Sequence, residues 1–423
     1  MVVLGKVILI VIDSLGIGEM RDVSTIRKED KGCNTLRHVL ECNEHLNIPN
    51  LEALGIINAL NQRIKGYNIS NKCIYCRCAL KYPGADSFLG HNEIVGINFN
   101  PFNSHSFSHF SNKIYHDISH YGYKLDIIEK NKLTCFIVDN EIIIGDNLEG
   151  EEGQLYSVIG SKNVNHDKLK IVANIVRKIV DIPRVSVSNC SLDIKELIEN
   201  IDIQDDRYIG LRATKCDLYN RGYKVSYLIN PNNKIQKEQE SCIDFILRKH
   251  MDIVLIGKVC DLLAYDDNID FHSCNISIKD IENPNIEKYN EISTEKIEEI
   301  TLKKIRDIKQ GLIFINFQET DNAGHVRDAV LYGKNLEKID RAIGNIIKVV
   351  EQDDLLIVTA DHGNDPCIGH SKHTREYVPV LLYKKSTNDE QKKLQDNSVV
   401  NLGNKTTLSY INDVILKYFE ATT

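Results

Sequence analysis

The sequence lacks both a long hydrophobic run and a block of basic residues. The apolar run near its start covers only Val7 to Ile12 before Asp13 interrupts it. A membrane span, or a signal peptide with its cleavage site, needs a considerably longer run. The 52 Lys and Arg residues against 60 Asp and Glu residues give a net charge of -8, which disfavours binding to a phosphate backbone. We therefore expect a cytoplasmic protein without a membrane or nucleic-acid partner.

The cysteines lack the arrangement of a disulfide framework or a zinc site. All 12 are scattered along the chain, and no secretory signal points to an oxidising compartment. Cys73, Cys76 and Cys78 form a tight group, but the second half of a four-ligand zinc site is missing nearby. We expect thiols that are buried or lie in edge strands.

What the chain does contain is a series of short, β-rich apolar runs that alternate with helical stretches. At 423 residues it is too long for one ordinary core, so two or three domains are expected. Continuous apolar runs are typical of strands in a parallel sheet that is covered on both faces. The runs cover residues 6–13, 252–258, 311–317, 354–361 and 378–384. They predict an α/β fold with a mostly parallel sheet.

Two segments have the 3.6-residue period of an amphipathic helix, residues 294–311 and residues 327–352. In the first segment Thr294 is predicted to be the N-cap residue and Gly311 to close the helix.

The character of the sequence changes between residues 98 and 248, where Asn, His, Lys and isolated charges are frequent. The strong strand patterns lie on both sides of this stretch. We therefore predict a core made of residues 1–97 and 249–423, with residues 98–248 forming an inserted α/β cap domain. Insertion at a surface loop is well tolerated because the chain ends lie close together there.

Acidic and histidine side chains follow several of the predicted strands. Ligands of open α/β sheets bind at the carboxyl ends of the strands, so these groups are expected to converge. One such group alone would be an ordinary cap or turn residue, but here several strand exits carry one. The residues are Asp13, Asp321, His325, Asp361, His362 and His373.

Mixed carboxylate and imidazole ligands suit divalent cations such as Mn2+ or Zn2+, and two ions roughly 4 Å apart would use six or seven ligands. Two metals also suit phosphoryl transfer, because they neutralise the phosphoryl oxygens and deprotonate a hydroxyl nucleophile. Ser87, in the glycine-rich stretch "YPGADSFLGHNEIVG", is the candidate nucleophile, since an isolated serine needs such activation.

These motifs together resemble the phosphopentomutases, members of the alkaline phosphatase superfamily and relatives of the cofactor-independent phosphoglycerate mutases. The resemblance is carried by "VIDSLGIGEM", "GADSFLGHNEIVG", "DNAGHVRDAVLYGKNLEKID", "LLIVTADHGNDP" and "HTREYVPVLLY". It covers residues 4–97 and 250–385 and matches residues 98–248 poorly. It implies an alkaline-phosphatase-like core with helices on both faces of the sheet.

The resemblance also assigns roles. Ser87 becomes the phosphorylated nucleophile and a metal ligand. One metal would be held by Asp13, Asp361 and His362, and the other by Asp321, His325 and His373. The family usually has threonine at the position of Ser87, and it places one more residue between the equivalents of Asp321 and His325.

Substrate contacts are less well matched by the resemblance. Lys258, in "IGKVCDLLAY", is implied as a phosphate contact. In the cap, "PRVSVSNC" keeps Arg184 but has Ser188 where the family has a second arginine, and Arg207 is a further cap candidate. Serine cannot reproduce the bidentate contact of arginine with phosphate.

The predicted function is metal-dependent transfer of a phosphoryl group between the 1- and 5-positions of ribose or deoxyribose phosphate through a phosphoserine. A phosphohydrolase, or a mutase for another sugar phosphate, is the alternative. A non-catalytic sugar-phosphate binding protein is a third hypothesis, disfavoured because the whole set of ligands is present. The sequence does not indicate an oligomeric state.

Overall fold

The described residues of the computed structural model form two compact units. These residues are 5–43, 45–99, 103–150, 152–212, 214–216, 225–229, 240–263, 293–385 and 398–422. One unit, the core unit, contains the described residues up to Asn98 and those from residue 240 onward. The other, the cap unit, lies within Phe99–Ile235, inside the stretch predicted as an insertion. Helix α9 (Cys242–Arg248) groups with the core unit, although the prediction placed it in the cap.

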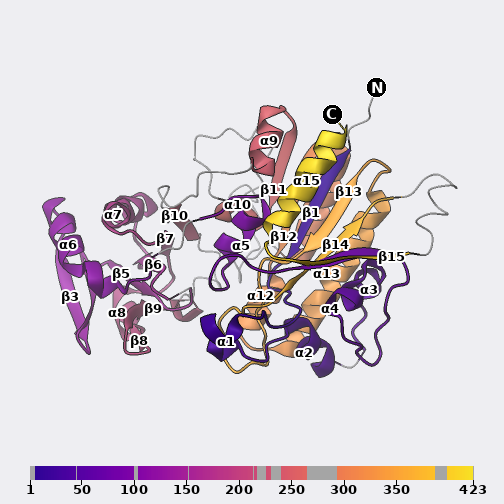
Figure 1. The fold of residues 1–423 in the computed structure, drawn as a ribbon. Helices are drawn as coiled ribbons and strands as arrows, with labels where there is room; N and C mark the ends of the chain where they lie inside the picture. The colour runs from indigo at the N-terminus through magenta and orange to yellow at the C-terminus, as the bar shows by residue number, and fades with distance from the viewer. Residues whose placement is uncertain are drawn as a thin grey trace. The chain divides into compact units, whose positions relative to one another are not determined.

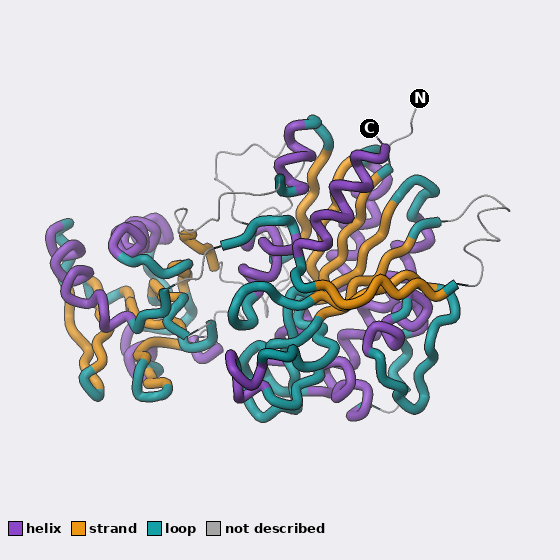
Figure 2. The backbone as a smooth tube through the Cα atoms, in the orientation of Figure 1, coloured by secondary structure: helices purple, strands orange, loops and turns teal. Residues whose placement is uncertain are grey.

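A seven-stranded sheet runs through the core unit (Figures 1 and 2). Its order is β11-β12-β1-β13-β14-β2-β15. The strands are β11 (Asp252–Ile256), β12 (Gly311–Phe317), β1 (Lys6–Ile12), β13 (Leu355–Thr359), β14 (Val378–Tyr383), β2 (Cys73–Cys78) and β15 (Val399–Lys405). The first four are mutually parallel, and every residue of β1 and β12 is buried. The predicted apolar parallel core is confirmed.

The sheet departs from the prediction on its other side. β14 was expected to be one of the parallel strands, but it runs antiparallel to both β13 and β2. β2 and the edge strand β15 were not predicted, because "CIYCRC" and "VVNLGNK" carry no continuous apolar run. Cys73, Cys76 and Cys78 lie in β2 and are buried, as expected of structural thiols.

Two sets of helix contacts stand out in the core unit. Helix α13 contacts α2, α3, α11 and α12, while α15 contacts α5 and α9, and α5 contacts α10. Figure 1 shows α13 and α15 on opposite faces of the sheet. Their bounds, with those of α1 and α4, are α1 (Val23–Ile26), α2 (Thr35–Cys42), α3 (Pro49–Leu54), α4 (Ile56–Leu60), α5 (Ser87–Ile94), α10 (Val259–Leu262), α11 (Thr294–Asp307), α12 (Glu319–His325), α13 (Ala329–Val349) and α15 (Ser409–Thr422).

The two predicted helices correspond to α11 and α13, with corrections at the ends of α11. Its N-cap is Ser293, whose hydroxyl accepts from the Lys296 amide at 3.3 Å, so Thr294 is the first helical residue. The helix ends at Asp307, and Gly311 begins β12. Gly311 has φ +141, and a Cβ there would meet the Asp252 carbonyl oxygen at 2.0 Å. Glycine is therefore required by the close neighbouring strand rather than by a helix end.

A second sheet forms the cap unit, in the order β10-β7-β6-β5-β4-β3, with β9 pairing to β5 and β8. Its strands are β3 (Leu125–Lys130), β4 (Leu133–Val138), β5 (Ile142–Asn147), β6 (Leu155–Gly160), β7 (Arg184–Asn189), β8 (Asp202–Gln204), β9 (Tyr208–Leu211) and β10 (Val225–Ile229). Its α-helices are α6 (Phe107–His120), α7 (His166–Ile179) and α8 (Ile194–Glu199). The turn from β4 to β5 has positive φ at Asp139 and Asn140, the residue types that tolerate this conformation.

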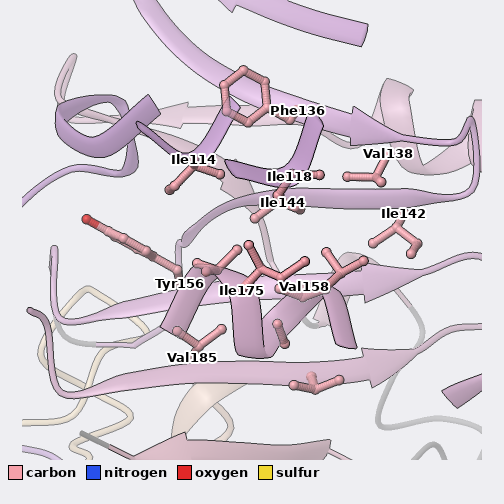
Figure 3. Close-up of a cluster of buried hydrophobic side chains, with 14 of the residues drawn as sticks. Ile114, Ile118, Phe136, Val138, Ile142, Ile144, Tyr156, Val158, Ile175 and Val185 are labelled. Atoms are coloured by element: carbon pink, nitrogen blue, oxygen red, sulfur yellow. The ribbon is translucent and has the colours of Figure 1, made fainter. Parts of the chain in front are cut away.

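Alternation along β4 buries side chains on both faces of the cap sheet. Phe136 and Val138 belong to one apolar cluster, which also contains Tyr156 and Ile175 (Figure 3). Cys135 and Ile137 belong to a second cluster. The period of two in a strand separates the two sets. None of the described helices in either unit is both long enough and apolar enough to cross a membrane.

Candidate active site

The candidate ligands lie at one edge of the core sheet. β12, β1 and β13 are adjacent and parallel, so their carboxyl ends meet at the same edge (Figure 1). Asp13 follows β1, and Asp361 follows β13 by one intervening residue. Asp321 and His325 lie one turn apart on α12, which follows β12. His373 precedes β14. The convergence expected from the strand ends is present.

Ser87 is the first residue of α5, so its position is set by the start of that helix. The N-cap Asp86 accepts a hydrogen bond from the Leu89 amide at 3.0 Å. Ser87 Oγ lies 2.8 Å from His362 Nε2 and 3.1 Å from Lys258 Nζ. The predicted nucleophile is thus in contact with one of the predicted metal ligands.

Asp13, Asp361 and His362 form one group of ligand atoms within 4.8 Å of one another. All three side chains are fully buried. His362 Nε2 is 3.1 Å from Asp361 Oδ2 and 3.6 Å from Asp13 Oδ1. These two buried carboxylate oxygens accept no well-aligned hydrogen bond, and their neighbours at ion-pair distance are imidazole nitrogens, of His362 for both and of His91 for Asp361 Oδ2. This donor set suits a divalent metal ion.

A second group contains Asp321, His373 and again His362. Asp321 Oδ1 lies 3.4 Å from His373 Nε2, and Asp321 Oδ2 lies 3.4 Å from His325 Nε2. The two imidazole Nε2 atoms of His325 and His373 are 3.1 Å apart. His362 therefore lies between the two sets of ligands, whereas the family resemblance assigned it to the set of Asp13 alone.

Backbone carbonyls fix the orientation of the three imidazole rings. Each Nδ1 faces a carbonyl oxygen: His325 faces Ser371 at 2.7 Å, His373 faces Ala85 at 3.1 Å and His362 faces Gly363 at 3.1 Å. A carbonyl oxygen only accepts, so each Nδ1 carries the hydrogen, and Nε2 points into the site. This is the arrangement by which proteins usually orient histidine ligands.

Burial and neighbouring charges set the pKa values of the site. Burial raises the pKa of Asp13 to about 6, assisted by the carboxylate of Asp361 and opposed by Lys258. Burial acts to lower the pKa of His362, but the neighbouring carboxylates, Asp361 first, outweigh it and raise that pKa to about 10. Burial and His362 lower the pKa of His373 to about 4, so it is neutral near pH 7 and its Nε2 carries a lone pair.

Lys258 lies among the predicted ligands. Its Nζ is 3.2 Å from both Asp13 Oδ2 and Asp321 Oδ2 and 3.1 Å from Ser87 Oγ. This residue follows β11, the strand next to β12, and the sequence had suggested it only as a phosphate contact. Its ammonium group lies within hydrogen-bonding distance of the hydroxyl expected to carry the phosphoryl group.

Two side chains that the prediction did not select connect the ligands behind the site. His91 Nδ1 lies 2.8 Å from the Ser87 carbonyl oxygen and 3.2 Å from Asp361 Oδ2. Its Nε2 lies 3.0 Å from Asn316 Nδ2, which donates to Asp13 Oδ2 at 3.2 Å. Both residues are fully buried. The signals in the sequence were a histidine one turn after Ser87 and a single amide in the apolar run "GLIFINF".

The predicted cap arginines lie in the cap unit. Arg184 is the first residue of β7, and its side chain is buried at 5% exposure. Arg207 is exposed in the turn between β8 and β9, with its guanidinium 5.4 Å from the centroid of the Tyr208 ring. Ser188 is buried within β7.

Comparison with known proteins identifies the family of the chain. The model of the Metalloenzyme superfamily matches residues 5–423. The chain belongs to this superfamily. It is 28% identical over 392 residues to the phosphopentomutase of Clostridium botulinum, covering 90% of this chain and 88% of that one. The phosphopentomutase of Mycoplasmopsis pulmonis is 27% identical over 403 residues, with coverage of 90% and 88%.

Among solved structures, a phosphoglycerate mutase of Leishmania mexicana is similar at a TM-score of 0.41 and 12% identity, covering 91% of each chain. The predicted resemblance to phosphopentomutases is confirmed by the match to the superfamily model and by phosphopentomutase relatives that cover 90% of this chain.

Proposed function

We propose that this superfamily member is a metal-dependent phosphomutase that moves a phosphoryl group between the 1- and 5-positions of ribose or deoxyribose phosphate. The coverage of the phosphopentomutase relatives, about nine-tenths of both chains, supports a shared reaction rather than a shared domain. Its site of action is in the cytoplasm, as expected from the sequence.

The observation that carries the proposal is the position of Ser87. Its Oγ lies 2.8 Å from His362 Nε2, and His362 belongs to both groups of ligand atoms. A hydroxyl at the junction of two sets of carboxylate and imidazole ligands is placed for activation as a nucleophile.

The residues at the strand ends would hold two divalent ions. Mn2+ is the preferred candidate, and Zn2+ is the alternative. Asp13, Asp361 and His362 would hold one, and Asp321, His325 and His373 the other, with Ser87 Oγ as a ligand. When bound, the ions supply positive charge to the phosphoryl oxygens and lower the pKa of the serine hydroxyl. The orphaned oxygens of Asp13 and Asp361 and the inward Nε2 atoms support this assignment.

The side chains then divide the reaction as follows. Phosphorylated Ser87 donates its phosphoryl group to the free hydroxyl of the sugar phosphate, which gives a bisphosphate. The bisphosphate returns its other phosphoryl group to Ser87. Ser87 is then phosphorylated again, and the substrate has been isomerised. Lys258 Nζ, 3.1 Å from Ser87 Oγ, is placed to bind an oxygen of the transferred phosphoryl group.

The proposed role of the cap unit is to retain the bisphosphate intermediate. A mutase must exclude water while the intermediate turns around, which a phosphatase need not do. Arg184 and Arg207 are the cap residues proposed to bind the phosphate that is farther from the metals. The exposed guanidinium of Arg207 makes it the stronger candidate, because Arg184 is buried.

The test is a product assay on ribose 5-phosphate with Mn2+ that follows both positional isomers and free phosphate. Formation of the 1-phosphate without free phosphate supports the mutase. Release of free phosphate alone would make the protein a phosphohydrolase, and neither product would favour a binding protein. Treatment with a chelator should abolish the isomerisation, and added Mn2+ should restore it.

A further inference from the structure

One buried arginine outside the ligand set contacts the chain segment that leads into Ser87. Arg375 is only 2% exposed, and it lies two residues after His373. Its Nε and Nη2 donate to Asp22 Oδ1 and Oδ2 at 2.9 and 2.8 Å. Its Nη1 donates to the carbonyls of Tyr82 and Gly84 at 2.6 and 2.7 Å, and Nη2 donates to that of Leu80 at 3.1 Å.

All five N–H groups of the guanidinium therefore have an acceptor. Three backbone carbonyls of one short segment point at the same side chain, and the next carbonyl, of Ala85, accepts from His373 Nδ1 at 3.1 Å. The segment is held further where the Tyr82 hydroxyl donates to the Asp86 carbonyl at 3.0 Å and accepts from the Asp86 amide at 3.1 Å.

We propose that Arg375 is a positioning residue that holds the backbone of residues 80–84 and thereby sets where Ser87 Oγ lies relative to His362. A planar guanidinium can serve a carboxylate and several carbonyls at once, whereas a lysine ammonium has three donors and no fixed fork. Arg375 contacts none of the candidate metal ligands with its side chain. Any effect of Arg375 on His373 must therefore be transmitted through the backbone between these two residues.

This inference rests on the proposed function, because it gives Ser87 the role of nucleophile. The matched pair of variants is Arg375→Lys and Arg248→Lys. Arg248 also pairs in a bidentate manner, with Glu240 at 3.0 and 2.8 Å, but it is exposed and lies elsewhere in the fold. Asp22→Asn is a milder variant, because it removes the charge that orients the guanidinium towards the three carbonyls, so residues 80–88 should exchange faster in it, though less so than in Arg375→Lys.

Two measurements on the full chain test the role. Hydrogen exchange of the peptide covering residues 80–88 should be faster in Arg375→Lys and unchanged in Arg248→Lys. Phosphorylation of Ser87 by a pentose bisphosphate, followed by mass spectrometry, should slow about a hundredfold in Arg375→Lys, because small displacements of reacting atoms cost that much. The Mn2+ content and the KM should stay within about threefold of wild type.

The outcomes separate this role from the proposed function. Wild-type exchange and wild-type labelling of Ser87 in Arg375→Lys would overturn the positioning role. If Arg375→Lys fails to fold, Asp22→Asn decides, and unchanged exchange of residues 80–88 in that variant has the same meaning. If wild-type protein itself is never labelled on Ser87, the proposed function fails, while the exchange measurement still tests the contact.

A second, independent feature is a pair of thiols on the surface of the core unit. Cys42, the last residue of α2, has its Sγ 3.6 Å from the Sγ of Cys367. Among the cysteines in the described part of the chain, these two alone are exposed. Cys367 lies between His362 and His373, and the same surface carries the contact of His38 Nδ1 with Asp365 Oδ2 at 2.6 Å.

We infer that Cys42 and Cys367 form a reversible disulfide by exchange with a small-molecule disulfide such as oxidised glutathione. Cys42 thiolate attacks the oxidant, forms a mixed disulfide and releases one thiol. Cys367, deprotonated in turn, attacks Cys42 Sγ and releases the second thiol, so the protein loses two hydrogens and the oxidant gains them. Both side chains are at the surface, so they can close the remaining distance.

The order of attack follows from the environment of the two thiols. Burial, the hydrogen bond shared with Cys42 and the negative charge of a Cys42 thiolate raise the pKa of Cys367 to about 12, so Cys367 is expected to act second. The resulting cross-link ties α2 to the segment between two candidate metal ligands.

Peptide mapping without reductant, after incubation of the reduced chain with oxidised glutathione, tests this site. A cross-linked peptide containing Cys42 and Cys367 is expected, with the buried Cys76 and Cys78 still reduced. In Cys367→Ser the glutathione adduct should persist on Cys42. A stable adduct on wild-type Cys42 without cross-linking, or two thiols that stay reduced, would overturn the inference.

Discussion

The core and cap units bury their polar groups differently. In the core unit Asp13, Asp361 and His362 are fully buried within a few ångströms of one another, at the edge where the parallel strands end. In the described part of the cap unit, Asp146 and Arg184 are the buried charged side chains, and the remainder of the interior is mostly apolar. Both units are α/β structures, so the fold class alone does not account for the difference.

The difference teaches where the chemistry is located. A buried carboxylate oxygen that accepts no hydrogen bond destabilises a fold, and such oxygens are retained mainly where they bind metals or take part in a reaction. Asp13 Oδ1 and Asp361 Oδ2 are of this kind. Asp146, by contrast, accepts from the amides of Phe107 and Ile209, both at 2.9 Å, and so links two elements of the cap.

The largest effect is expected at Ser87. If the phosphoryl transfer takes place in the core unit, Ser87→Ala should reduce turnover by at least about a thousandfold, because the nucleophile is lost. Ser87→Thr should keep a large share of the activity, since it retains the hydroxyl. Mass spectrometry after incubation with a sugar bisphosphate should find phosphate on Ser87 of the wild type. Phosphate on Ser14 instead would contradict the assignment.

Removal of one ligand should separate metal binding from folding. Asp361→Asn should weaken metal binding by more than about a hundredfold, because loss of even an outer hydrogen-bonding partner costs up to that much. Metal analysis of the purified variant measures this. Asp354→Asn is the control, since Asp354 is also fully buried but accepts from the Lys6 amide at the other end of β1. Full metal occupancy in Asp361→Asn would refute the site.

Asp146 gives a prediction for the cap alone. Burial, opposed by the two amide hydrogen bonds, raises the pKa of Asp146 to about 7 from an ordinary value of 3.8. The folded cap therefore binds this proton more tightly than the unfolded chain does. Its stabilising contribution is complete below about pH 4 and is lost as the pH rises through about 7, by at most about 4 kcal/mol.

Hydrogen exchange of cap amides between pH 5 and pH 8, corrected for the intrinsic rate, would measure this loss. Asp146→Asn should make the corrected protection independent of pH. Wild-type protection that does not change with pH over that interval would show that the carboxylate is already ionised in the folded state, and the comparison between the units would then weaken.

Much of the core could be predicted from the sequence, for identifiable reasons. "KVILIVID" and "DLLIVTAD" are apolar because both faces of their strands are covered, so the period and the following aspartates are visible without a structure. The expected convergence of Asp13 and Asp361 needed only the rule that parallel strands end at one edge. The α/β class followed from the same runs.

The remainder depends on contacts between residues far apart in sequence. The parallel pairing of β15 with β2 could not be seen, because an edge strand is polar and its partner is distant. His91 and Arg375 lie in motifs that carry the resemblance, but those motifs do not show which residues the two side chains contact. Their roles come from Asp361 and from three carbonyls that only the fold brings to them.

The smallest effect is expected at the cap arginines. Their variants test whether the cap unit takes part in substrate binding. If Arg207 binds the far phosphate of the substrate, Arg207→Ala should raise KM and increase the fraction of phosphate lost to water, by about 1.5–3 kcal/mol for a charge-assisted hydrogen bond. Arg184→Ala should change KM less, because the Arg184 side chain is buried in β7, and should instead lower the stability of the cap. Steady-state kinetics with both positional isomers, combined with a free-phosphate assay, measures the two variants side by side. Wild-type KM and wild-type phosphate release in Arg207→Ala would remove that residue from substrate binding, and a larger effect of Arg184→Ala on KM would reverse the order of the two.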